Sequence, residues 1–122
     1  MTAGLKTLEL ITAPRFHDSL FAQTEKFIKG LQEEANKANI PMTTNHIGSM
    51  FGFFFTQEVA VTNYKQVMAC DSERFGRFFR GMLDAGVYFA PAAYEGCFMS
   101  AAHTNEDIEF TLEAASKVFK TL

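Results

Sequence analysis

Few residues of this chain have the type and setting that catalysis or binding requires, and Glu95 is the one that stands out. It lies in the stretch PAAYEGC, residues 91–97, among uncharged neighbours and between two apolar segments typical of strands. A carboxylate on a loop that a rigid scaffold positions can face a ligand. A loop acid that meets only solvent fits the same spacing, and the spacing alone favours that simpler interpretation.

The common catalytic and cofactor-binding motifs do not occur in the sequence. It contains no GxGxxG, no P-loop and no GxSxG. Ser49 lacks the strand–turn–helix setting of a nucleophile, so strand-end packing is the better interpretation. The two cysteines form no CxxC and the three histidines share no ligand spacing, which predicts neither a metal site nor a disulfide framework. These residues are Cys70, Cys97, His17, His46 and His103.

The composition is typical of one globular domain. Of the 122 residues, 48% are hydrophobic and 20% charged, which suffices for an apolar core. A net charge of -3 argues against a nucleic-acid partner and against a polybasic membrane-surface site. No apolar run approaches the ~20 residues of a membrane span, and no signal peptide is visible. These features indicate a protein of the reduced cytoplasm, with no membrane or nucleic-acid partner.

Hydrophobic periodicity and capping residues predict the elements that would position Glu95. Four helices are expected over residues 3–12, from Pro14 to about residue 38, from Asp71 or Ser72 to Gly86, and from Thr104 to the C-terminal region. Strands are expected over 43–49, 51–56, 87–90 and 98–101, with a helical turn at 64–68 inside a loop. This order leaves little room for parallel crossovers. It predicts an α+β fold, with a small mostly antiparallel sheet that carries helices on one face.

One predicted strand is unusual because it is apolar on both faces. In MFGFFFT, residues 50–56, Phe51, Phe53 and Phe55 point one way, while Gly52 and Phe54 point the other. A half-buried strand would alternate apolar with polar residues. Both faces of this strand are therefore expected to be covered.

Several motifs in order resemble the C-terminal end of the glutamate-1-semialdehyde 2,1-aminomutase family, pyridoxal-phosphate enzymes related to class III aminotransferases. The stretch GVYFAPAAYEGCFMSAAHTNEDIEFTLEAA carries the family's Ala-Pro, aromatic-Glu and Phe-x-Ser-x-Ala-His-Thr pattern. TNHIGSMFGFFFT, SERFGRFFRGMLDAGVY and TAGLKTLELI match upstream segments. Tyr94 replaces the more common phenylalanine of the family, and Gly96–Cys97 replaces the more usual Ala–Gly.

The resemblance implies the C-terminal domain fold of type I pyridoxal-phosphate transferases and a parent enzyme that is a homodimer. That enzyme converts glutamate-1-semialdehyde to 5-aminolevulinate for tetrapyrrole (porphyrin) synthesis. The Schiff-base lysine and the other cofactor-binding residues of the family belong to its large domain. The chain is therefore expected to hold no catalytic or cofactor-binding residue, and to be inactive alone.

The resemblance also assigns parts of the chain. Residues 1–12 would be the end of a helix that links to the large domain, and residues 13–122 the small domain. Glu95 matches a family glutamate near the mouth of the substrate site. The partners implied are the large domain and a second subunit, and the outer face of the 51–55 strand would meet that large body, with Gly52 allowing close approach. Without it, the isolated chain is expected to self-associate.

Two other interpretations remain open at the level of sequence. The chain resembles, less well, the same domain of another class III aminotransferase, such as one acting on an ω-amino acid. Related aminotransferases often have Arg before the proline, whereas this chain has Ala90 before Pro91. A free-standing α+β interaction module is the third interpretation.

Overall fold

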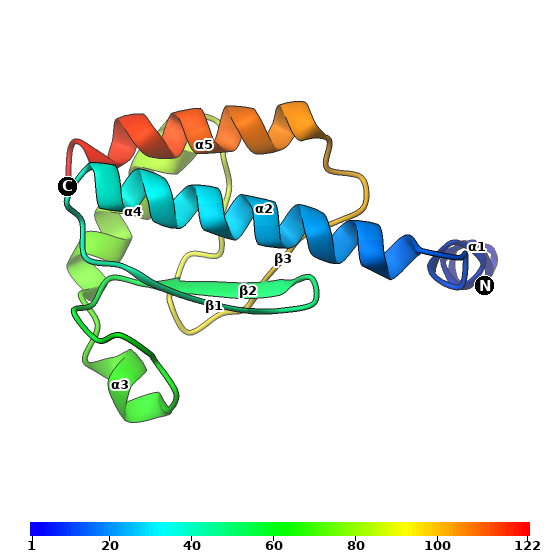
Figure 1. Cartoon of the computed structure of the whole chain (residues 1–122), viewed down its shortest axis with the longest axis horizontal. Helices are drawn as coiled ribbons and strands as arrows, with labels where there is room; N and C mark the ends of the chain where they lie inside the picture. Colours follow the sequence, from blue (N-terminus) through cyan, green and yellow to red (C-terminus); the bar gives the residue numbers. More distant parts are fainter.

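The computed structural model describes all residues, 1–122, and shows an α+β fold (Figure 1). A three-stranded antiparallel sheet has the order β1-β2-β3, so the predicted fold class is confirmed. No helix is long and apolar enough to cross a bilayer. The elements are α1 (Thr2–Ile11), α2 (Phe16–Lys37), β1 (Thr43–Ile47), β2 (Met50–Phe54), α3 (Tyr64–Met68), α4 (Ser72–Asp84), β3 (Cys97–Phe98) and α5 (Asn105–Phe119).

A tight hairpin sets the register of the sheet. Ile47 pairs with Met50, so the connection contains only two residues. Gly48, the first of them, has a φ of 58°, which only glycine adopts without strain and which a type II′ hairpin turn requires there. This register turns Phe51 and Phe53 toward the helices.

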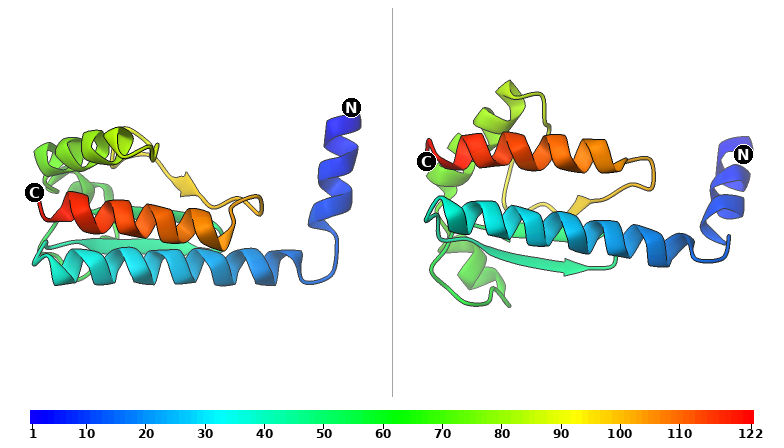
Figure 2. Two further views of the ribbon diagram at one scale, coloured as in Figure 1. Left: turned by 90° about the horizontal axis from the view of Figure 1, so that it is seen from above. Right: turned by 45° about the horizontal axis from the view of Figure 1, so that its top comes forward.

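The long helices cover one face of the sheet. Helices α2 and α5 lie side by side and run in the same direction, and α4 packs beside α5 (Figures 1 and 2). Aromatic rings fill the space between the layers: Phe78 of α4 lies with ring centroids 5.4 Å from Phe53, 5.5 Å from Phe55 and 4.9 Å from Phe119. One apolar core therefore joins β2 to all three long helices.

The helix starts follow the predicted capping chemistry. The Asp71 side chain accepts a hydrogen bond from the Arg74 N–H at 2.8 Å, which confirms the start of α4. Thr104 and Asp107 form a reciprocal capping box at α5. Gly86, with a φ of 88°, follows the end of α4 as predicted.

The chain itself covers much of the second face of the Phe-rich strand. Phe54 is buried there, in a cleft lined also by Tyr64 and Val67 of α3 and by Tyr94. A Cβ at Gly52 would lie 3.4 Å from the Phe54 ring, which is an ordinary van der Waals contact, so the packing within this chain does not require a glycine there. The prediction that the large domain covers this whole face was wrong for Phe54, which this chain buries itself. Ile47 and Met50 at the outer end of this face remain exposed, as does Phe98, which pairs with Met50.

Other predicted boundaries need correction. Residues 87–90 form no strand, although Val87 and Phe89 pack their side chains on the core. The last strand is Cys97–Phe98 rather than 98–101, and the two hairpin strands end earlier than predicted. Pro14 lies in the turn before α2 rather than in its first turn, and Leu83 of α4 is exposed.

Helix α1 stands apart from the rest of the molecule (Figure 2). None of its residues is buried. Its leucines Leu5 and Leu8 are 66% and 57% exposed. Because water disfavours such side chains, α1 is a surface that a further contact would stabilise.

Candidate functional site

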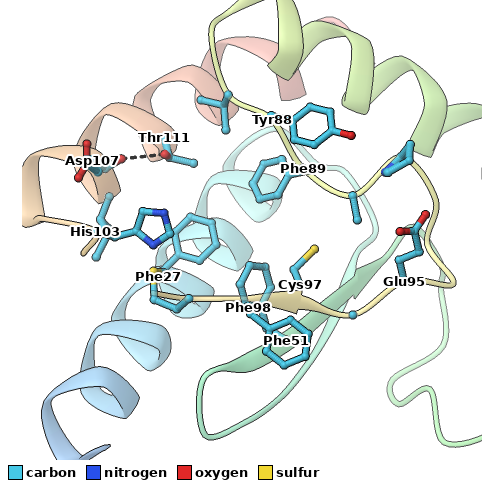
Figure 3. A pocket seen from close by; sticks show the side chains of 16 residues that line it. Phe27, Phe51, Tyr88, Phe89, Glu95, Cys97, Phe98, His103, Asp107 and Thr111 are labelled. Carbon is cyan, nitrogen blue, oxygen red and sulfur yellow. Dashed lines mark hydrogen bonds between the residues drawn. The ribbon is translucent and has the colours of Figure 1, made fainter. Parts of the chain in front are cut away.

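The candidate site is a cleft of about 390 Å³ between the extended segment 87–91, strand β3 and the start of α5 (Figure 3). Its floor is made of buried rings from three different parts of the chain, Phe27, Phe51 and Phe89. Tyr88 and Phe98 flank it and are largely exposed.

Glu95 borders this cleft at one end. It closes a turn in which its N–H donates to the Ala92 carbonyl at 3.2 Å. Its carboxylate accepts no hydrogen bond from the protein and is exposed to solvent, free to meet a ligand. Glu95 also borders the second cleft, where the rings of Tyr64 and Tyr94 lie 5.9 Å apart. That Glu95 lies near the mouth of a substrate site remains a prediction.

Cys97 lines the same cleft, a role that sequence reasoning missed. Burial raises the pKa of the Cys97 thiol, and the negative charge of Glu95 raises it further, whereas a backbone hydrogen bond with Ala90 opposes the shift. The thiol is therefore protonated at neutral pH and behaves as a small apolar group rather than as a nucleophile. Its position two residues after Glu95 was the only signal in the sequence.

His103 forms the opposite end of the cleft, and it too was missed. Its Nδ1 accepts a hydrogen bond from the Ser100 N–H at 3.0 Å. Asp107, also at this end, accepts hydrogen bonds from the backbone N–H and the hydroxyl of Thr104, at 2.7 and 2.9 Å. These bonds hold the pKa of the Asp107 carboxyl below its usual range.

The lining of this cleft does not fit pyridoxal phosphate. No lysine lines the cleft to form a Schiff base, and no arginine is there to meet a phosphate. The charged groups that line it are carboxylates, which would repel that phosphate. The structure also contains no group of three or more His, Cys, Asp or Glu side chains placed to hold a metal ion.

The chain was compared with family models, curated proteins and solved structures. No family model matches the chain. It is 53% identical, over 119 residues and 98% of its length, to the glutamate-1-semialdehyde 2,1-aminomutase of Delftia acidovorans. The chain spans only 27% of that protein. The resemblance predicted from the sequence motifs is thereby confirmed.

Solved structures show the same fold. The FumI protein of Sphingopyxis sp. MTA144, described as its PLP internal aldimine form, matches 98% of the chain at a TM-score of 0.76 and 25% identity, over 26% of its own length. An ω-transaminase from Sphaerobacter thermophilus matches 85% at a TM-score of 0.67 and 18% identity, over 24% of its length. The chain thus has the C-terminal domain fold of pyridoxal-phosphate aminotransferases.

Proposed function

We propose that this chain serves as the C-terminal domain of a pyridoxal-phosphate-dependent glutamate-1-semialdehyde 2,1-aminomutase. The observation that carries the proposal is 53% identity across nearly the whole chain to an enzyme of that name. The complete enzyme would convert glutamate-1-semialdehyde to 5-aminolevulinate in the cytoplasm, as an intramolecular aminotransferase feeding porphyrin synthesis. It would act as a homodimer.

In this proposal the chain contributes part of the wall of the substrate site and the Glu95 carboxylate, and the large domain binds the cofactor. Pyridoxal phosphate supplies the stabilisation of the substrate carbanion when it is bound by the large domain. The chain's own part is Glu95, which would orient the substrate or move a proton at the mouth of the site.

The two-part division of the chain also belongs to the proposal. Residues 1–12 would link to the large domain, and residues 13–122 would be the small domain. The separation of α1 from the core supports this division, since α1 buries none of its side chains on the rest of the chain. Alone, the chain would self-associate to cover the same surface.

A second candidate is the same domain of another class III aminotransferase. The ω-transaminase likeness favours it, but at 18% identity it speaks only for the fold. Ala90 before Pro91 weakens it, because the chain lacks the arginine that would meet a substrate carboxylate there. A free-standing interaction module has no comparable support.

A domain exchange tests the proposal. When this chain replaces the matching 119 residues of the Delftia acidovorans aminomutase, the chimaera should make 5-aminolevulinate within about tenfold of the parent rate, or ~1.4 kcal/mol of barrier. The matching segment of the Sphaerobacter thermophilus transaminase is the control and should not restore activity. The isolated chain should form no aldimine with pyridoxal phosphate. A folded, cofactor-loaded chimaera that transaminates only ω-amino acids would favour the second candidate.

Glu95→Gln in that chimaera should lower turnover or substrate affinity by roughly a hundredfold, the low end of what a positioned acid or base contributes. Its melting temperature should stay nearly unchanged, because the exposed carboxylate makes no hydrogen bond within the chain. Steady-state kinetics and thermal melts of the same preparation measure both. A lower melting temperature with unchanged kinetics would make Glu95 a structural residue.

A further inference from the structure

A row of exposed apolar side chains crosses the sheet on the face turned away from the long helices. Ile47 pairs with Met50 in the hairpin, and Met50 pairs with Phe98 of β3. Side chains directly opposite one another share a face of the sheet, and alternation along β2 places this row opposite to Phe51. Their exposed fractions are 72%, 42% and 66%. These three residues, called the sheet patch below, form the kind of contiguous apolar surface that marks a contact with another molecule.

The shape of the sheet patch suits a helix. The second cleft continues it along the sheet, because Ile47 and Met50 line that cleft together with the rings of Tyr64 and Tyr94. Two strand spacings of ~4.8 Å make the patch roughly 10 Å wide, which is close to the diameter of one α-helix. A helix lying across the three strands would therefore contact all three side chains of the patch.

Helix α1 offers the matching apolar surface. Leu5 and Leu8 lie one turn apart on one side of it, and no residue of α1 is buried. The charged side chains of α1, Lys6 and Glu9, pair with each other at 2.9 Å, so the helix brings no unpaired side-chain charge to an apolar contact. Arg15, with a φ of 65°, lies in the turn that directs α1 away from the core (Figure 2).

We propose that α1 of one copy of the isolated chain lies across the sheet patch of a second copy, with its leucines on the patch. Each copy carries both surfaces, so two copies that exchange α1 close a dimer with two identical contacts. A contact between two α1 helices would leave both sheet patches in water, whereas the exchange covers both kinds of surface. This inference rests on the self-association proposed above and not on the proposed enzyme activity.

Two variants disable the two surfaces separately. The α1 variant combines Leu5→Glu with Leu8→Glu, and the patch variant combines Ile47→Glu with Phe98→Glu. Each alone should sediment as a monomer at a concentration at which the unmodified chain associates. Phe110→Glu, which places a charge on an exposed ring outside both surfaces, is the control and should remain associated. Thermal melts should show that every variant folds, because all the substituted side chains are exposed.

Mixing the two disabled variants tests the pairing itself. The α1 variant keeps an intact sheet patch, and the patch variant keeps an intact α1. In nuclear magnetic resonance, adding the unlabelled patch variant to the labelled α1 variant should cause saturable amide shifts at Ile47, Met50 and Phe98. Adding unlabelled α1 variant instead should cause none.

Three outcomes would overturn the proposal. A patch variant that associates alone would place the contact between two α1 helices. A mixture that gives no saturable shift, or shifts only outside the sheet patch and the second cleft, would exclude the patch as the surface that receives α1. An unmodified chain that sediments as a monomer would remove the contact altogether. The domain exchange tests the enzyme activity separately, so its expected result does not change with any of these outcomes.

Discussion

Phe78→Ala should lower the free energy of unfolding by about 3–5 kcal/mol, the usual loss for deleting a buried phenylalanine ring. Phe78 has no exposed surface, and its ring lies near those of Phe53 in β2, of Phe55 directly after β2, and of Phe119 in α5. Removing it leaves a cavity at the centre of the core. For a domain of this size that loss is a large part of the total stability. Urea denaturation measures it as a lower midpoint at unchanged slope.

Phe110→Ala is the matched control for this prediction. It makes the same chemical deletion in a helix, but Phe110 is 55% exposed on α5. We expect a change within roughly 1 kcal/mol, because little buried surface is lost and alanine favours the helix. If the two variants lost equal stability, the Phe78 cluster would not be the centre of the core.

The helices could be predicted from the sequence because their signals are local. Asp71 and Thr104 cap α4 and α5 through residues three positions away. Gly86 follows the end of α4 because its positive φ favours glycine, which is also a local requirement. The hairpin was predictable for the same reason, since the Gly48 turn fixes its register. Residues 87–90 were predicted as a strand and are not one. Their apolar pattern reports burial, and a strand needs a partner that no local pattern reveals.

The candidate site was only partly predictable because it is assembled from distant segments. Loop composition singled out Glu95. The sequence spacing does not show that Cys97, His103 and Tyr88 line one cleft, because their proximity depends on how the chain folds. Gly52 was predicted to allow the close approach of another body, but within this chain a Cβ there would make only an ordinary contact with Phe54.

The surface of α1 leads to the second prediction with a large effect. Leu5 and Leu8 lie on one side of this helix, and both are more than half exposed. Covering each would stabilise an assembly by on the order of 1 kcal/mol or more. The exposed Ile47 and Met50 at the hairpin end add apolar surface. The isolated chain should therefore be a dimer or larger at tens of micromolar, as measured by sedimentation.

Leu5→Glu combined with Leu8→Glu should convert that assembly to monomer, because two carboxylates cannot be buried in an apolar contact without pairing. Lys6→Glu is the control. It makes the same change in net charge on the opposite side of α1, where Lys6 pairs with Glu9 at 2.9 Å. The control variant should remain associated. If the double variant still associates, the contact lies at the hairpin end rather than on α1. If the unmodified chain sediments as a monomer and binds no hydrophobic dye, the prediction of self-association is wrong.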